Sequence, residues 1–564
     1  IQTSNFLNKL ANALLLASLA FSNLGANASA KVISSLPVDA AQTQPALEFV
    51  PGVVLVGLKP GVSLAMGGVV VSDRHILTNS SKLGVMLKAQ QILDLQPAFP
   101  DAQMTVLGAK NAQGGAASGL AQIYRLSLPA SADVKVAVKS LASNPDLLFA
   151  EPDYIARAAE GETDTPTPTE TVPVTLTETL TSTETETATP TETPTPAETA
   201  TVTATVTETT TPTETPVTAA TITEMIRLTE TPALQATPTV TATGTTTRTA
   251  TATVMLPLNA IPYVNDPLFS QQWGLSKINV DGAWETAIGS STTIIAIIDS
   301  GIDLNHTDLV TKIWTNPGEI PGNGIDDDNN GYKDDVHGWN FVASNNIVED
   351  DNGHGSLVAG IAAAVGNNGQ GIIGVCPQCQ LMPVKVMNSA GTANYSAIAA
   401  GVLYAAQKGA QVINLSVGGY ADSNILRTAI ETAANTYGVV IVAGAGNDNQ
   451  DVPFYPAAYD SVLAVAGTQT DDTKVGTSNY AAWVDVSAPG ADILSTALGS
   501  GWLSNSGTSF AAPFASGLAG LLVSQRPTWK QATIRSQIVY TAIDIDALNP
   551  ATAGLLGSGR LDAG

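Results

Sequence analysis

Apolar and polar residues follow one pattern between residues 46 and 160. They alternate with a period of two in GVVLVGLKPG, QIYRLSLPA and LLFAEPDYIARA, and they have helical spacing in DVKVAVKSLAS between the last two of these runs. This pattern predicts a small α+β domain, which we call the front domain.

A different pattern runs from residue 262 to residue 564. Continuous apolar runs such as TTIIAIID and VVIVAGAGN alternate with amphipathic stretches such as NYSAIAAGVLYAAQKG. This order predicts an α/β fold with a doubly wound, mostly parallel sheet and helices on both faces, which we call the main domain. Ligands of such sheets bind beyond the carboxyl ends of the strands, so candidate chemistry is sought there.

Residues 162–255 separate the two domains with a low-complexity repeat of Thr, Pro, Glu, Ala and Val. This composition has almost no aromatic residue to form a core, and it is typical of an extended linker or stalk. The threonines also make it a candidate for O-glycosylation.

The first 30 residues contain one cation, Lys9, then an apolar run from Leu10 to Leu24, and then small residues that end at Ala30. This is the pattern of a secretory signal peptide cleaved after Ala30. The alternative is an uncleaved membrane anchor, but the run is shorter than the span of about 20 residues that a bilayer requires. We therefore expect a secreted, extracellular protein with no stable membrane span after signal removal, or one held at the cell surface by the linker.

The chain has 564 residues, 44% of them hydrophobic, and a net charge of −25. The apolar content supports at least one large core and excludes a wholly disordered chain. The negative charge argues against nucleic acid or an anionic membrane as partner, because either would be repelled. Much of this charge lies in the linker, so it indicates solubility rather than a substrate. We expect a monomer.

Three residues with possible catalytic chemistry lie at connections of the predicted sheet. Asp299 ends the run TTIIAIID, His354 lies between glycines in DDNGHGSLVAG, and Ser509 opens a small-residue helix in GTSFAAPFASG. Taken singly, each has a structural explanation, as a turn residue, a buried histidine or a helix cap.

Taken together, these residues favour catalysis. A serine becomes a good nucleophile when a neighbouring base accepts its proton, and the base needs a third group to fix its tautomer. Asn447, in the Gly-rich turn after VVIVAGAG, would lie at the same edge and can donate its amide to a developing oxyanion.

The motifs DSGID, NGHGSLVAG, VAGAGN and GTSFAAPFASG resemble those of the subtilase family, and they occur in the family's order Asp, His, Ser. The resemblance covers residues 262–564 and implies a serine endopeptidase that acts on proteins and peptides. Ser356 stands where the family more often has Thr, which retains the hydroxyl.

The segment LSVGGY resembles the family's substrate-pairing strand, through Ser416, Val417 and Gly418. Gly419, Gly444 and Ala445 are small, so the primary pocket is expected to be roomy and apolar and to prefer a large apolar residue before the cut. The alternative is that the glycines only serve turns.

Residues 322–339, GNGIDDDNNGYKDDVHGW, form an acidic loop that resembles the first half of a calcium loop. Similar acidic inserts in subtilases bind calcium for stability, and the alternative is a solvated acidic loop. The resemblance adds Asp308 as a ligand of the family's common calcium site, with Asn367 or Asn368 beside it. The expected ligands within the acidic loop are Asp326, Asp328, Asn330, Tyr332 and Asp335.

Cys376 and Cys379 in VCPQCQ are the only cysteines, which is too few for a zinc site made of cysteines alone. A local disulfide is the expected state, with two free buried thiols as the alternative. A thioredoxin-like role is the other interpretation of a C-x-x-C pair.

The front domain, 46–160, resembles the inhibitory prodomain of subtilases, above all in AEPDYIARA. The resemblance implies a zymogen that processes itself, near residues 157–165, and whose own prodomain is its intramolecular inhibitor. The competing functions are a catalytically silent subtilase-like surface or binding protein and a thiol-disulfide enzyme.

Overall fold

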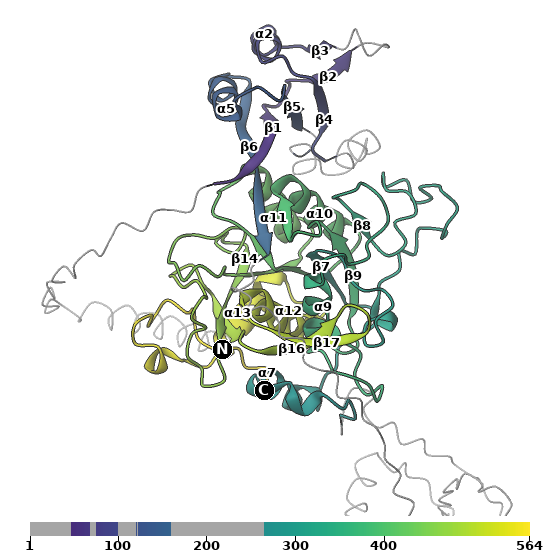
Figure 1. The fold of residues 1–564 in the computed structure, drawn as a ribbon, viewed down its shortest axis with the longest axis vertical. Coiled ribbons are helices and arrows are strands. Elements are labelled where there is room, and N and C mark those ends of the chain that lie inside the picture. Colours follow the sequence, from purple (N-terminus) through teal and green to yellow (C-terminus); the bar gives the residue numbers. More distant parts are fainter. Residues whose placement is uncertain (1–46, 68–74, 100–119, 121, 159–263) are drawn as a thin grey trace, which may run out of the picture.

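The computed structural model describes residues 47–67, 75–99, 120, 122–158 and 264–564 (Figure 1). The predicted signal peptide, 1–30, and linker, 162–255, lie outside these residues. None of the helices in the described parts of the chain has the length and apolar character that a membrane crossing requires.

A parallel sheet forms the centre of the main domain, with the strand order β15-β14-β13-β11-β7-β9-β8 in the described residues. Its order reverses direction along the chain, as in a doubly wound fold, so the predicted fold class is confirmed. The strands are β7 (Ile294–Asp299), β8 (Trp339–Asn340), β9 (Gln380–Lys385), β11 (Val412–Leu415), β13 (Val440–Gly444), β14 (Val462–Thr468) and β15 (Val486–Pro489).

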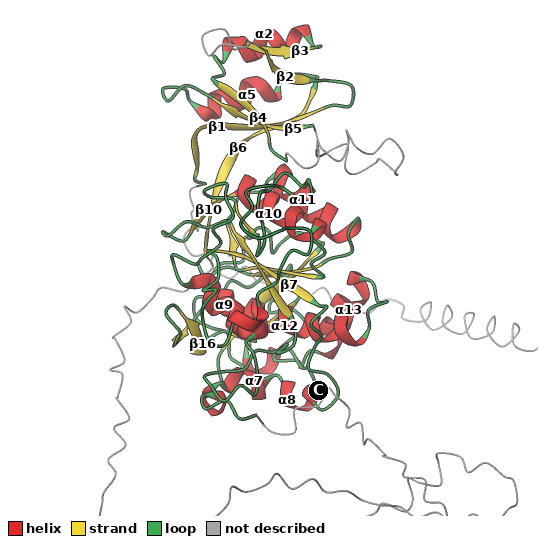
Figure 2. Ribbon diagram, turned by 90° about the vertical axis from the view of Figure 1, so that its right-hand side faces the viewer, coloured by secondary structure: helices red, strands yellow, loops and turns green. Residues whose placement is uncertain are grey.

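Helices cover both faces of this sheet, and β7 shows why (Figure 2). Ile295 and Ile297 point into a core with α9, α12 and α13, whereas Ala296 and Ile298 point into a core with α10 and α11. Alternate residues of β7 therefore pack into the same core. Because both faces of the strand are buried, the strand has to be apolar throughout. The helices are α9 (His354–Ala363), α10 (Tyr395–Gln407), α11 (Asn424–Asn435), α12 (Thr508–Gln525) and α13 (Gln531–Thr541).

Shorter elements complete the described part of the main domain. They are the helices α7 (Trp273–Lys277) and α8 (Val280–Trp284), the 3-10 turns Phe269–Gln271, Val310–Lys312 and Asp546–Leu548, the short strands β10 (Thr392–Asn394) and β12 (Val417–Gly418), and the hairpin β16 (Ile493–Ala497) and β17 (Gly501–Asn505).

The front domain has an antiparallel sheet in the order β6-β1-β5-β4, with helices α2 and α5 on one face. The sequence predicted β1, β5, α5 and β6 but not α2, whose periodicity is weakened by Gly84 and by the exposed Val85. The elements are β1 (Phe49–Leu58), β2 (Leu64–Gly67), β3 (His75–Thr78), α2 (Ser81–Ala89), β4 (Asp94–Pro97), β5 (Ile123–Ser127), α5 (Val134–Ala142) and β6 (Leu147–Ala158).

The two faces of the front-domain sheet have different partners. Val54, Val56 and Leu126 face the domain's own helices, whereas Leu55 and Ile123 belong to the core that contains α10 and α11 of the main domain. The long strand β6 continues out of the front domain into the main domain (Figure 1). The front-domain sheet is thus covered on its second face by the main domain.

Candidate active site

Asp299 and His354 meet at the carboxyl edge of the central sheet. Asp299 is the last residue of β7, and His354 is the first residue of α9, after Gly353 with a φ of +103°. The imidazole Nδ1 donates to Asp299 Oδ1 at 2.7 Å, and the residues are only 1% and 0% exposed. A buried carboxylate in this position orients the ring and stabilises its protonated form.

Ser509 is the second residue of α12, which packs against α9. Its hydroxyl donates to the carbonyl oxygen of Ser416 at 3.2 Å. The ring of Phe510, the next residue, lies 5.5 Å from the ring of His354, measured between centroids. The structure therefore brings the start of α12 close to the histidine.

Asn447 lies at the same place, in the turn after β13. Its side-chain oxygen accepts the backbone N–H of Thr508 at 3.0 Å, so the remaining function of the amide is its NH₂ donor. Gly444 is required for this approach, because a Cβ there would lie 2.9 Å from the carbonyl oxygen of Thr508. At this position the glycine allows close packing rather than a turn.

A buried network that the sequence did not predict joins Asp299 to His354. Ser300 Oγ donates to Asp350 Oδ1 at 2.8 Å and accepts the backbone N–H of Gly355 at 2.9 Å. Asp350 Oδ2 accepts both the N–H and the hydroxyl of Ser356, at 2.9 and 2.7 Å. The only sequence signal for this network was its position inside the motifs DSGID and DDNGHGS.

An extended segment of the front domain runs beside these residues, between two short strands. Residues Ile155, Ala156 and Arg157 of β6 pair antiparallel with β10, while Arg157 and Ala158 pair with β12. Of the residues predicted to pair with substrate, Val417 and Gly418 form β12, and Ser416 directly precedes it. The neighbouring Gly419 bonds through both main-chain groups to Tyr455, and Ala445 is buried.

Two carboxylates of β6 meet helix starts of the main domain. Glu151 accepts Ser423 Oγ, the N–H and side-chain amide of Asn424, and the N–H of Ile425, at the start of α11. Asp153 accepts the N–H and hydroxyl of Ser396 at the start of α10. Carboxylates stabilise helix N-termini, and burial raises the pKa of Asp153.

Comparison with known proteins places this geometry in a family. Residues 290–559 match the model of the subtilase family. The chain is 40% identical to thermitase from Thermoactinomyces vulgaris, over 53% of this chain and 97% of thermitase. It is 39% identical to a thermophilic serine proteinase from Bacillus sp. (strain AK1), over 47% of this chain and 61% of that protein. Subtilisin Savinase from Lederbergia lenta is 34% identical over 52% of this chain and 97% of the relative.

The chain belongs to the subtilase family. It is a subtilisin-like serine endopeptidase, since its relatives include a serine proteinase and a subtilisin.

Carboxylates of the acidic loop of this subtilase form a cluster, but the cluster does not contain all of the predicted calcium ligands. Oxygens of Asp328, Asp335 and Glu319 all lie within 4.8 Å of one another, and Glu319 was not predicted. Asp326 instead accepts the backbone N–H groups of Asn330 and Gly331 at 2.9 and 2.8 Å.

The other predicted loop residues support this cluster rather than lie at its centre. Asn330 Nδ2 donates to Asp335 at 3.1 Å, and the ring of Tyr332 packs against Trp339 and Tyr404. Lys408 pairs with Asp328 and Asp335, but one ammonium does not balance three carboxylates. Burial raises the pKa of Glu319, and the charges of Asp335 and Asp328 raise it further. A hard cation with oxygen ligands would fit this group.

Asp308, the second predicted calcium position, already has three donors. Its carboxylate accepts Asn368 Nδ2 at 2.9 Å, the N–H of Ile372 at 3.0 Å and Trp502 Nε1 at 2.9 Å. Of the two asparagines considered, Asn368 reaches Asp308, and Asn367 instead donates its N–H to Asp266.

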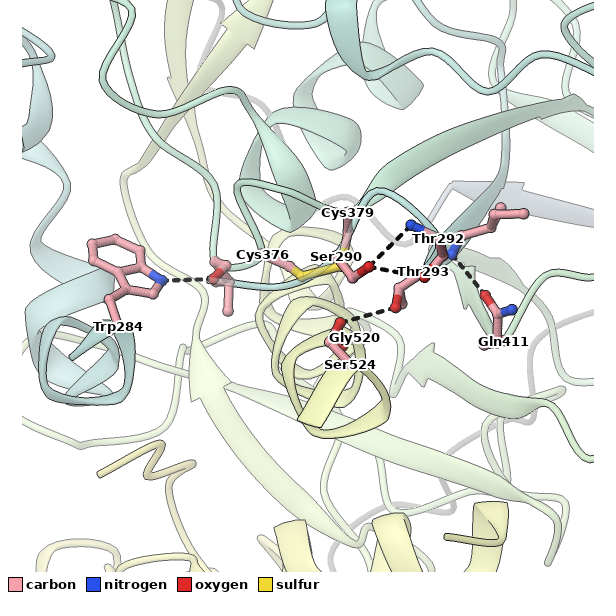
Figure 3. Close-up of a disulfide and its surroundings, with 11 residues drawn as sticks. Trp284, Ser290, Thr292, Thr293, Cys376, Cys379, Gln411, Gly520 and Ser524 are labelled. Carbon is pink, nitrogen blue, oxygen red and sulfur yellow. Dashed lines mark hydrogen bonds between the residues drawn. A yellow bond between two sulfur atoms is a disulfide. The ribbon is translucent and has the colours of Figure 1, made fainter. Parts of the chain in front are cut away.

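Cys376 and Cys379 form a disulfide with an S–S distance of 2.03 Å, as expected (Figure 3). Both are buried, and their sulfurs lie beneath Gly520 of α12. A Cβ on Gly520 would lie 3.0 Å from the sulfur of Cys379, so the bridge is part of the packing against α12.

Proposed function

We propose that Asp299, His354 and Ser509 form the catalytic triad of this endopeptidase. The observation that carries the proposal is the buried 2.7 Å bond from His354 Nδ1 to Asp299 at the edge where α12 begins with Ser509. Ser509 Oγ attacks the peptide carbonyl carbon while His354 Nε2 accepts its proton, and Asp299 stabilises the imidazolium. The imidazolium then protonates the leaving amine, and water repeats the sequence on the acyl-enzyme.

Asn447 and the backbone N–H of Ser509 would hold the oxyanion of the tetrahedral intermediate. The bond from the Thr508 N–H to the Asn447 oxygen supports this role, because it fixes the amide beside the start of α12 and leaves its NH₂ as the donor. Donors fixed in advance stabilise developing charge without reorganisation.

Ser416, Val417 and Gly418 bind substrate backbone as an added strand, in the manner of the segment Ile155–Ala158, whose ends pair with β10 and β12. The primary pocket, beside Gly419, Gly444 and Ala445, accepts a large apolar residue before the cut. A peptide library tests this preference, and a basic preference would contradict it.

The front domain is the inhibitory prodomain of a secreted precursor. Its strand β6 pairs with β10 and β12, the two edges of the proposed substrate groove. Its carboxylates accept hydrogen bonds at the N-termini of two helices of the main domain. Self-processing near residues 157–165 then gives an enzyme that carries the linker at its own N-terminus. Residues 1–30 direct secretion.

Calcium binds for stability at Glu319, Asp328 and Asp335, with oxygens of the acidic loop around them. The unbalanced negative charge of this group, in which Glu319 and Asp335 are buried, supports the proposal. The ion takes no part in peptide hydrolysis.

The deciding experiment compares the full chain with Ser509→Ala and with a matched control, Ser516→Ala. Ser516 is a second buried serine of α12, and its hydroxyl bonds Asn414 rather than a group near His354. We expect Ser509→Ala to stay at precursor size and to lose casein hydrolysis, while Ser516→Ala matures and digests casein. A Ser509→Ala protein that processes itself or digests casein as the wild type does would disprove the triad.

A further inference from the structure

Asn447 lies in a turn outside the described helices and strands. The turn follows β13, and a second chain segment, residues 477–480, runs alongside it. Main-chain bonds join the segments: Asn479 N–H donates to the Gly446 carbonyl at 2.8 Å, and Asn449 N–H donates to the Thr477 carbonyl at 2.7 Å.

The side chain of Asn479 closes this turn around Asn447. Its Nδ2 donates to the carbonyl of Ala445 at 2.9 Å, and its Oδ1 accepts the N–H groups of Asp448 and Gln450 at 3.0 and 2.9 Å. One amide therefore bonds the chain on both sides of Asn447. Asn479 is fully buried, so water does not compete for these bonds.

Asparagine suits this position because it combines donor and acceptor in one short side chain. Nδ2 also donates to the hydroxyl of Tyr420 at 3.2 Å, and that hydroxyl donates to the carboxylate of Asp448 at 2.5 Å. The turn is thus tied to residues 477–480 on one side and to Thr508, beside Ser509, on the other.

We propose that Asn479 is a positioning residue for the oxyanion donor Asn447. Its hydrogen bonds reach the backbone of Ala445, a residue of the proposed pocket, but no residue of the triad, and it acts by holding the turn so that the Asn447 amide meets the developing oxyanion. The inference rests on the proposed oxyanion role of Asn447. A small misplacement of a catalytic group costs up to about a hundredfold in rate, and we expect about tenfold here, in kcat rather than KM.

The test is a double-mutant cycle in the matured enzyme, with Asn479→Ala, Asn447→Ala and both together. Active sites are counted by titration with a fluorophosphonate, so that kcat refers to competent enzyme. Positioning predicts that Asn479→Ala lowers kcat about tenfold alone but less than about twofold when Asn447 is already alanine, since independent sites add and coupled sites do not.

The matched control is Asn549→Ala. Asn549 is also a buried asparagine with main-chain partners, Asp472, Ile545 and Lys474, but it lies outside the Asn447 turn. It should lower the melting temperature as Asn479→Ala does and leave kcat unchanged.

Equal losses from Asn479→Ala in both backgrounds, or no loss of kcat, would overturn the positioning role. An unchanged kcat in Asn447→Ala alone would instead remove the oxyanion role on which it rests. If Asn479→Ala yields no mature enzyme, the same cycle is run with Asn479→Asp, which keeps the acceptor for Asp448 and Gln450 and loses the donor to Ala445.

Discussion

The front and main domains differ in what completes their cores. The central sheet of the main domain has helices of its own domain on both faces, whereas the front-domain sheet, within the residues that the structure describes, has its own helices on one face. Leu55, Phe99 and Ile123 of the front domain are buried through the core that contains α10 and α11. Separation would therefore expose apolar surface on both domains, but the central sheet of the main domain would keep its helices on both faces. The front domain therefore depends on the main domain to cover the second face of its sheet.

All proposed catalytic groups lie in the main domain. Among the variants, Asn447→Ala should have the largest effect. Losing one oxyanion donor costs about a hundred- to a thousandfold in turnover, as is known for a subtilisin. We expect kcat to fall by this amount with KM nearly unchanged, because the groove strands are untouched. Steady-state kinetics on a peptide substrate checks this, and an unchanged kcat contradicts it.

Glu151→Ala should weaken the contact between the two domains without changing any proposed catalytic residue. This change removes the acceptor at the start of α11, and loss of a cap costs about 1 kcal/mol, or about fivefold in the equilibrium that holds the front domain. The lag before casein hydrolysis should therefore shorten.

The matched control is Leu148→Ala in the same strand, because Leu148 is 60% exposed. It should keep the wild-type lag. Equal lags in Glu151→Ala and wild type would show that the caps do not hold the front domain.

Calcium removal should change stability rather than turnover or release of the front domain, and it should act on the main domain alone. A ligand at a hundred times its Kd stabilises by about 2.7 kcal/mol, so chelation should lower the melting temperature by about 5 °C. Differential scanning calorimetry with and without a chelator measures this.

Two variants then decide which residues hold the ion. Glu319→Gln should abolish the effect of chelation, because Glu319 belongs to the carboxylate cluster, and Asp326→Asn should preserve it. The reverse result would favour the ligand set expected from the sequence.

Sequence patterns predicted those parts of the fold and site that lie within continuous motifs. Asp299 ends an apolar run, His354 follows a glycine, and Ser509 opens a helix, so each could be placed at the sheet edge from local signals. Asn447 could be placed in the same way, after the run VVIVAGAG.

What the sequence did not show depends on contacts between distant segments. Asn479 lies in the polar stretch TSNY, and its importance appears only when residues 445–450 fold beside it. Glu319 precedes the acidic loop and reaches Asp328 and Asp335 through the fold. The run VVLV in β1 is apolar at every position and departs from the alternation expected for this stretch, because this part of the strand is buried on both faces.

The groove that β6 fills has a consequence for solubility. Once an extended chain leaves it, β10 and β12 are open strand edges, and such edges can pair with other proteins and start aggregation. These two strands span only Thr392–Asn394 and Val417–Gly418. Edges this short pair with one extended peptide but are poor templates for a growing sheet, so the enzyme can bind unfolded chains without joining their aggregates.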